Sequence, residues 1–369
     1  MTAIRENTGS VVPHEIIVLA NGVSEETALP VKAESGVRLL RSRANLGFGG
    51  GCNWASRYAR GTYLVLLNDD ALVEPGWLEG LVGAAESNDN LGAVGSLVLT
   101  SDHRVQEAGR VLWRDGVSHG IADGWSESKV AVLPVVREVD SCSGCSLLIR
   151  RSAWDAVNGF DERYFPAYYE DIDLTLSLRT RGWAVACTTA SRVRHHRSAS
   201  TPPLWRRFLG VRNHGLLLAK WSDALECFDL RPRDRPTARE VIGASRGSGA
   251  RRRALYHRFG VSTTSDQALP RSGAKRARGG KVANDDVNER LELLEREVAA
   301  LEAQLRLKDE YIAHLDATAP QMEHALDRLL RAERRRALVG EWAARVPLLK
   351  RAAHGLRKRI APQHKTGAR

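Results

Sequence analysis

The chain lacks the features that mark membrane-spanning, secreted and zinc-stabilised proteins. No apolar run approaches the about 20 residues that a transmembrane helix needs, and the start, MTAIRENTGS, has no apolar signal-peptide segment. Only five of the 369 residues are cysteine. Cys142 and Cys145 form a C-x-x-C pair without a second pair or suitably spaced histidines, so we expect a structural role for them. These absences predict a reduced, cytoplasmic protein.

Aromatic residues are also scarce, at 6% of the chain, although the net charge is +11. Lys and Arg concentrate in residues 231–281 and 331–369. Single-stranded nucleic acids are held partly by stacking on aromatic side chains, so we expect no nucleic-acid partner. Anionic lipid headgroups suit such basic segments better. This predicts a peripheral position on the inner face of a membrane.

What the chain does have is an alternation of short apolar strands and helices over its first 220 residues. Strands are expected at residues 15–20, 37–40, 63–67, 91–99, 146–149 and 183–187, and helices at 75–86, 152–157, 172–181 and 204–221. The pattern predicts an α/β fold with a mixed, mostly parallel sheet flanked by helices. Ligands of such sheets collect at the carboxyl ends of the strands.

The last third of the chain changes in composition. Residues 226–283 are expected to form a basic, partly helical linker, and residues 319–369 a basic helical tail. Between them, residues 284–318 carry apolar positions that alternate in steps of four and three. These positions are Val287, Leu291, Leu294, Val298, Leu301, Leu305, Lys308, Ile312 and Leu315. The spacing predicts a coiled coil and a homo-oligomer; the alternative is a solitary amphipathic helix folded onto the domain.

The first candidate site is Asn68-Asp69-Asp70, at the end of an apolar strand. Carboxylates in this place suit a hard divalent cation, which prefers oxygen ligands and leaves positions open for phosphate oxygens. The alternative is a solvated turn, because Asn-Asp is common in turns.

The second candidate is the glycine-rich stretch Asn45–Asn53, which we expect to be a loop followed by a helix. Glycines let backbone N–H groups approach a phosphate or a ribose closely. The same stretch is also compatible with a tight strand-to-helix turn.

The third candidate is Asn158–Asp173, which ends in three acids after an aromatic run. An apolar wall raises the pKa of a neighbouring carboxylate and makes it suitable as a general base. Acids at a helix start also simply favour the macrodipole. Downstream, His195 and His196 are either metal ligands or a polar surface pair.

In this order the segments resemble the family 2 glycosyltransferases, which have the GT-A fold, and within them the bacterial rhamnosyltransferase-like members. Those proteins carry N-x-G-F-x-x-G-x-N, L-N-x-D, G-G-F-D-E-x-F-F-x-x-x-E-D-x-D and V-x-H-x-x-x-x-S motifs. The matching segments are Asn45–Asn53, Leu67–Asp70, Asn158–Asp173 and Val193–Ser200. The resemblance covers about residues 14–220 and implies a glycosyltransferase domain over residues 1–225.

The resemblance implies a role for each matched residue. Asp171 is the implied general base for the acceptor hydroxyl, with Glu170 and Asp173 orienting it or binding the acceptor. Asp70 and His195 are the implied ligands of Mg²⁺ or Mn²⁺, with His196 as the substitute for His195. The implied contacts to the nucleotide-sugar donor come from Asn21, Asn45, Gly47, Phe48, Asn53, Asn68 and Asp69. Arg212-Asn213 resembles an Arg-Asn pair that the family carries after its catalytic core.

The implied reaction is the inverting transfer of a sugar, such as rhamnose, from a dTDP- or UDP-sugar to a cell-surface glycan or a lipid-linked acceptor. Two departures weaken the nucleotide side. The family's first strand and helix are not matched, so the domain is expected to be incomplete at its N-terminus, and Ala20 replaces the family's Asp before Asn-Gly. The alternative is therefore a catalytically degenerate scaffold that self-associates through the coiled coil.

Overall fold

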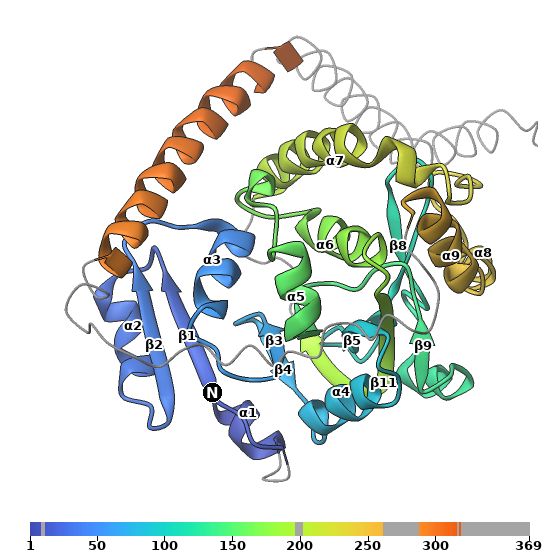
Figure 1. Cartoon of the computed structure of the whole chain (residues 1–369), viewed down its shortest axis with the longest axis horizontal. Coiled ribbons are helices and arrows are strands. Elements are labelled where there is room, and N and C mark those ends of the chain that lie inside the picture. Colours follow the sequence, from blue (N-terminus) through green and yellow to red (C-terminus); the bar gives the residue numbers. More distant parts are fainter. Residues whose placement is uncertain (9–11, 196–201, 261–287, 316, 319–369) are drawn as a thin grey trace, which may run out of the picture. The chain divides into compact units, whose positions relative to one another are not determined.

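The computed structural model describes residues 1–8, 12–195, 202–260, 288–315 and 317–318 (Figure 1). Its strands are β1 (Ile16–Asn21), β2 (Val37–Ser42), β3 (Tyr63–Leu67), β4 (Ala71–Val73), β5 (Leu91–Leu99), β6 (Val105–Glu107), β7 (Arg110–Leu112), β8 (Ser118–Gly120), β9 (Val136–Glu138), β10 (Ser146–Arg150) and β11 (Ala184–His195). Its helices are α1 (Thr2–Asn7), α2 (Glu25–Lys32), α3 (Gly47–Ser56), α4 (Trp77–Glu86), α5 (Arg151–Val157), α6 (Glu170–Arg179), α7 (Pro203–Leu225), α8 (Ala238–Ser245) and α9 (Ser248–Arg258). Two 3₁₀ turns lie at η1 (Glu127–Val132) and η2 (Glu162–Tyr164).

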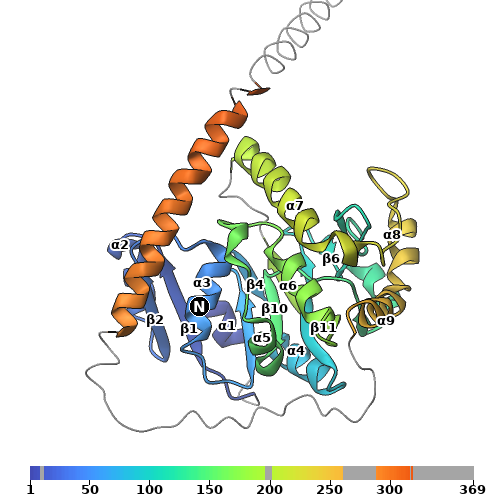
Figure 2. The same ribbon diagram turned by 45° about the horizontal axis from the view of Figure 1, so that its top comes forward.

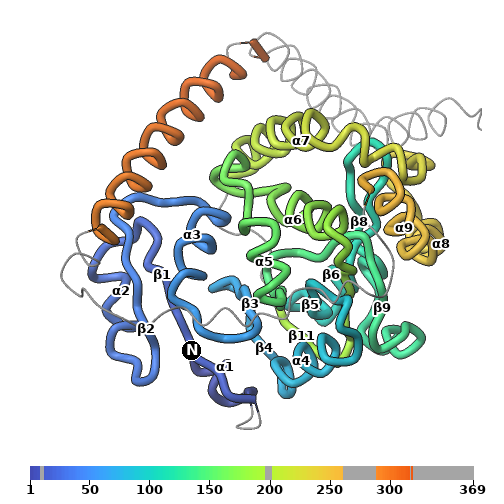
Figure 3. Tube along the Cα trace, viewed as in Figure 1, coloured from blue at the N-terminus to red at the C-terminus, as the bar shows by residue number. Residues whose placement is uncertain are grey.

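The centre of the fold is a seven-stranded sheet in the order β3-β10-β5-β11-β4, with β6 beside β5 and β9 beside β11. β11 runs parallel to β5, and the two strands lie side by side in the Cα trace of Figure 3. The predicted α/β fold with a mixed sheet is confirmed. The expected predominance of parallel pairs is wrong, because β10 enters antiparallel between β3 and β5 and the outer strands also pair antiparallel.

Helices cover both faces of this sheet (Figures 1 and 2). β5 is buried along its whole length, and its alternating side chains serve two cores. Leu97 belongs to the core that includes Leu174 of α6. Val94 belongs to the other core, with Leu81 of α4. A strand buried on both faces reads as a continuous apolar run, which is why residues 91–99 were recognisable from the sequence.

The N-terminal strands form a separate two-stranded parallel sheet, β1-β2, against which α3 packs. The prediction of a glycine-rich loop followed by a helix is wrong, because α3 already begins at Gly47 and contains these glycines. A Cβ at Gly51 would lie 3.2 Å from Leu19 and Asn21, and one at Gly49 would lie 3.0 Å from Phe160. The glycines therefore let α3 approach its neighbours closely.

Within the segment predicted as a basic, partly helical linker, residues 238–245 and 248–258 form helices of the first compact unit. Helices α8 and α9 pack on the domain, with Val241 and Leu255 buried. Arg251 of α9 and Arg179 of α6 both contact the fully buried Asp140, at 2.8 and 3.7 Å. The basic composition of this segment reflects buried ion pairing as well as solvated charge. Most of the remaining predicted linker, and the predicted tail from residue 319, lie outside the described residues.

Residues 288–315 form one helix. Residues 1–305 make up one compact unit, and residues 306–369 a second. In the first unit, the start of this helix lies beside β2 and α3 (Figures 1 and 2). Among the described residues, no helix combines the length and the apolarity required to cross a membrane.

Candidate active site

Two strand ends bring Asp70 and His195 together. Asp70 directly precedes β4, and the antiparallel register pairs Ala71 of β4 with His195 at the end of β11. His195 Nε2 lies 3.2 Å from Asp70 Oδ1. The two residues implied as metal ligands are thus neighbours, although 125 positions separate them in the chain.

The donor set of this pair fits a cation. His195 Nδ1 lies 3.3 Å from Gln106 Oε1. In the neutral tautomer with the proton on Nδ1, Nδ1 donates to this oxygen and Nε2 presents a lone pair toward Asp70. Asp70 Oδ1 is buried and receives no hydrogen bond among the described residues. Two acceptors that face each other require a proton or a metal ion between them. No group of three or more His, Cys, Asp or Glu side chains in the described part of the chain surrounds such an ion, so substrate oxygens and water would complete its shell.

Asp171 lies in the first turn of α6 and is half-buried. Burial raises the pKa of the Asp171 carboxyl, and the charge of Glu107 adds to this effect. The positive charge of Arg110 and hydrogen bonds from the backbone of Ile172 and Gly144 oppose it. The predicted upward direction of the pKa agrees with this environment. Such a carboxylate is a better proton acceptor than an exposed aspartate.

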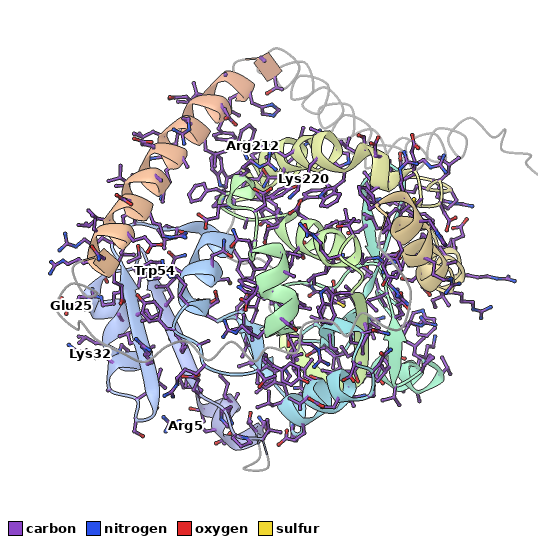
Figure 4. The ribbon with its side chains drawn as sticks, viewed as in Figure 1. Arg5, Glu25, Lys32, Trp54, Arg212 and Lys220 are labelled. Atoms are coloured by element: carbon purple, nitrogen blue, oxygen red, sulfur yellow. The ribbon has the colours of Figure 1, made fainter. Side chains whose placement is uncertain are left out.

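The two acids beside Asp171 differ from each other. Glu170 is buried, and its Oε2 has no hydrogen-bond partner among the described residues. Burial, together with the charge of Asp171, raises its pKa well above the ordinary value for glutamate. Asp173, by contrast, accepts hydrogen bonds from Trp221 Nε1 at 2.6 Å and Lys220 Nζ at 2.9 Å. Its carboxylate joins α6 to α7, on which Figure 4 labels Lys220. These surroundings do not favour a direct contact between Asp173 and an acceptor.

The segment Ser143–Cys145 joins these groups. Ser143 N donates to Glu107 Oε1 at 2.9 Å, and Cys145 O accepts from Asn68 N at 3.0 Å. Gly144 lies between them, where a Cβ would stand 2.9 Å from the Phe48 ring and 4.0 Å from Asp171 Cβ. Gly144, within the isolated C-x-x-C pair, therefore lies next to both Phe48 and Asp171, and its neighbours Ser143 and Cys145 contact Glu107 and Asn68.

Glu107 and Arg110 are the charged residues that sequence reasoning missed. Glu107 is buried, and its Oε2 accepts from Arg110 Nη1 at 2.9 Å. Arg110 also donates to Ser118 Oγ at 2.9 Å. The sequence offered one signal for them, a glycine between two opposite charges in Glu107-Ala108-Gly109-Arg110. Gly109 adopts a φ of +76°, which favours glycine.

We call Asp70, Glu107, Glu170, Asp171 and His195 the acid cluster. The loop that leads into its Asp171 has two aromatic residues in the left-handed region, Tyr168 (φ 81°) and Tyr169 (φ 75°). This conformation is strained for bulky side chains. The buried Asn213 of α7 holds the loop, since its Nδ2 lies 3.1, 2.9 and 3.0 Å from the carbonyl oxygens of Tyr164, Ala167 and Tyr168. Arg212 Nη1 donates in turn to Asn213 Oδ1 at 2.8 Å (Figure 4).

We call Asn21, Asn45 and Asn53 the asparagine network. Asn21 Nδ2 donates to Asn45 Oδ1 at 3.2 Å and to Gly47 O at 3.0 Å, while its Oδ1 accepts from Leu46 N at 2.8 Å. Asn45 Oδ1 also accepts from Gly47 N at 2.9 Å. Asn21 and Asn45 thus bind mainly each other and the start of α3.

Asn53 is tied to the loop before η2. It accepts from Phe160 N at 2.8 Å and donates to Phe160 O and Glu162 Oε1, each at 2.9 Å. Phe48, another residue expected to bind the donor, packs its ring 5.5 Å from that of Phe160. These contacts stabilise the fold. That Asn53 and Phe48 also contact the nucleotide-sugar stays a prediction.

The remaining predicted residues are less constrained. Asn68 is half-buried and Asp69 exposed at the end of β3. Ala20 is buried in β1. His196, the substitute metal ligand, lies outside the described residues.

The sequence of the chain matches a known protein family. The family model described as "Glycosyl transferase family 2" matches residues 3–155. The chain is 31% identical to "N-acetylglucosaminyl-diphospho-decaprenol L-rhamnosyltransferase" of Mycobacterium tuberculosis, over 51% of this chain and 68% of that protein. It is 34% identical to "O-antigen biosynthesis protein RfbC" of Myxococcus xanthus, over 40% of this chain and 12% of that protein.

Solved structures of glycosyltransferases are similar at lower identity. GalNAc-T7 with UDP, GalNAc and Mn²⁺ matches with a TM-score of 0.49 at 14% identity, over 61% of this chain and 45% of that one. The mannosyltransferase PcManGT from Pyrobaculum calidifontis, with GDP-Man and Mn²⁺, matches with a TM-score of 0.41 at 13% identity, over 82% and 81%.

Proposed function

Because the chain belongs to glycosyl transferase family 2, we propose that it transfers a sugar, such as rhamnose, from a dTDP- or UDP-sugar to a glycan or lipid-linked acceptor. The relative of known activity is an L-rhamnosyltransferase acting on a lipid-linked sugar. The chain spans 68% of that relative and only 12% of the O-antigen biosynthesis protein. The substrates and partners proposed for this chain therefore rest on the residues of its candidate active site.

The observation that carries the proposal is the acid cluster. A base of raised pKa and a cation-fitting pair adjoin one short segment. The Gly144 backbone is hydrogen-bonded to Asp171, and Cys145 O accepts from Asn68 N, two residues before Asp70. Sugar transfer from a nucleoside diphosphate needs these two capacities together. One group removes a proton from the acceptor, and the other side accommodates the negative charge of the departing diphosphate.

The chain's own residues supply most of the chemistry. Asp171 takes the proton of the acceptor hydroxyl, which then attacks the anomeric carbon from the face opposite the diphosphate and inverts its configuration. Asp70 and His195 would hold a divalent ion, Mg²⁺ or Mn²⁺, and such an ion would neutralise charge on the diphosphate. Gln106 Oε1, 3.3 Å from His195 Nδ1, would favour the tautomer with the proton on Nδ1, in which Nε2 offers its lone pair to the ion.

The donor nucleotide is proposed to lie between the strand end at Asn68-Asp69 and the start of α3. The position of Asn68 next to the cation pair supports this place. The first N–H groups of α3, those of Gly47 and Phe48, are already paired with Asn45 Oδ1 and Pro166 O, so they would bind the donor only by exchanging these partners. Asn21 and Asn45 would act mainly by fixing that turn. For a lipid-linked acceptor, the basic C-terminal residues 331–369 would bring the protein to an anionic membrane surface.

A donor panel tests this proposal. Purified full-length protein would be titrated calorimetrically with dTDP-rhamnose, UDP-sugars and GDP-mannose, each with Mn²⁺ and with EDTA. We expect one donor class to bind in a metal-dependent way and to release its nucleoside diphosphate when acceptor is added. The alternative scaffold function predicts folded protein that binds no donor, a result favoured by Ala20.

A further inference from the structure

The helix of residues 288–315 has two distinct faces, and only one of them is used by its own domain. The domain-facing residues in the first compact unit are Leu293, Glu297, Ala300 and Gln304, spaced three or four apart so that they share one side of the helix. Ala300 is buried in a core with Trp54, Ala44 and Leu46; Trp54 is labelled in Figure 4. This face anchors the helix.

Polar contacts make the anchoring specific. The buried Glu297 accepts from Arg43 N at 2.5 Å and from Ser42 Oγ at 3.1 Å. Gln304 Nε2 donates to Asn45 O at 3.1 Å. A buried carboxylate is costly unless it is hydrogen-bonded, so the helix sits on this surface in one register.

The neighbouring face carries the heptad residues, and it is exposed. Half or nearly half of each side chain remains accessible: Leu291 54%, Leu294 43%, Val298 55%, Leu301 50% and Leu305 62%. We call these five residues the outer stripe. Their spacing alternates between three and four residues over two heptads. A continuous row of exposed leucine and valine is not what a solvated helix face carries.

We propose that the outer stripe pairs with the outer stripe of a second copy of this chain, in a parallel two-stranded coiled coil. The occupant is a second copy because the 4–3 spacing is self-complementary: an a/d seam packs against another seam of the same period. The domain-facing residues leave the seam uncovered, so pairing does not require the helix to leave its domain. This association goes beyond sugar transfer and does not depend on it.

Charge selects the parallel orientation. With Leu291, Val298 and Leu305 at the a positions, Arg290 lies at g and Glu295 at e of the next heptad, and both are exposed. In a parallel pair, Arg290 of each chain faces Glu295 of the other. In an antiparallel pair, the e positions would face each other, and these include Glu295 and Glu302. Like charges there would oppose association. The parallel pair brings Glu297 at g toward Glu302, but the Glu297 carboxylate is buried against Ser42 and Arg43 of its own domain.

The mass of the full chain in solution tests the pairing. Analytical ultracentrifugation is expected to give twice the mass of one chain. The double variant Leu294→Glu, Leu301→Glu places four charges in the seam and is expected to weaken the dimer by about 100-fold or more. The matched control Asn288→Glu, Ala299→Glu adds the same charge at exposed positions outside the outer stripe, and its dimer is expected to persist.

Orientation has its own readout. In a parallel dimer the two 305 positions face each other, whereas in an antiparallel one residue 305 faces the opposite end of the stripe. Leu305→Cys is therefore expected to form an interchain disulfide on oxidation. Circular dichroism shows whether the variants keep their helix content. Three results would overturn the proposal. The wild type could be monomeric, the dimer could survive the seam substitutions with its helix retained, or Leu305→Cys could fail to cross-link the dimer. The mass measurement needs no donor, so the failure of sugar transfer would leave this outcome readable.

Discussion

The acid cluster and the asparagine network are both polar, but their side chains are satisfied to different degrees. In the asparagine network, Asn21 and Asn53 each make three hydrogen bonds within the chain. In the acid cluster, Asp70 Oδ1 and Glu170 Oε2 are buried without a hydrogen-bond donor among the described residues. A buried polar atom without a partner costs about 1–3 kcal/mol. That cost persists most readily where function selects for it.

The comparison separates chemistry from scaffold. Polar groups that are already paired stabilise the fold and have little capacity left for a substrate. Groups with open hydrogen-bonding positions and raised pKa values are poised to bind an ion or move a proton. We therefore expect substitutions in the acid cluster to reduce activity with little loss of stability, and substitutions in the asparagine network to do the reverse.

The largest effect is expected for Asp171→Asn. An amide accepts no proton at neutral pH, so the turnover rate should fall by about 10³-fold, while donor binding changes little. Steady-state kinetics and calorimetric donor titration measure the two quantities separately. In the wild type, the raised pKa of Asp171 means that the rate rises with pH at a higher pH than an ordinary aspartate would give. An undiminished rate in the variant would remove Asp171 from the role of base.

Asp70→Asn is expected to have the second largest effect. It replaces a charged ligand by a neutral one, so the affinity for Mn²⁺ alone should fall by about 10–100-fold or more. Mn²⁺ titration followed by electron paramagnetic resonance measures this without any substrate. Asp89→Asn, an exposed acid elsewhere, is the matched control. Equal Mn²⁺ affinity in both variants would place the cation site away from the Asp70–His195 pair.

Asn53→Ala probes the other region. It leaves the backbone N–H and carbonyl of Phe160 without their partner, which should lower the free energy of unfolding by about 1–3 kcal/mol. Urea denaturation measures this change. The turnover rate of the folded fraction should stay close to that of the wild type. A large loss of rate without a loss of stability would contradict the assignment of Asn53 to the scaffold.

The sequence predicted elements better than it predicted contacts. β5 and α4 were foreseeable because continuous apolar runs and helical periodicity are local signals. The pairing of Asp70 with His195 was implied only by family resemblance, since no local pattern links residues 125 positions apart. Glu107 and Arg110 escaped notice because their strands are three residues long. The glycines of α3 were misassigned because glycine disfavours helices, and close packing outweighs that preference here.

Glu170→Gln is expected to give the smallest effect, and its sign follows from the pKa. In the folded protein the pKa of Glu170 is raised, so between the ordinary and the raised pKa the native state binds more protons than the unfolded chain. Stability therefore falls as pH rises through that interval. Glutamine does not titrate, so the variant should match the wild type near pH 4 and be more stable than the wild type at pH 8. Urea denaturation at both pH values, with exposed Glu6→Gln as control, measures the difference. If the wild type and Glu170→Gln lose stability in parallel with pH, Glu170 belongs with the satisfied groups of the scaffold, and the boundary between the two regions must be redrawn through the first turn of α6.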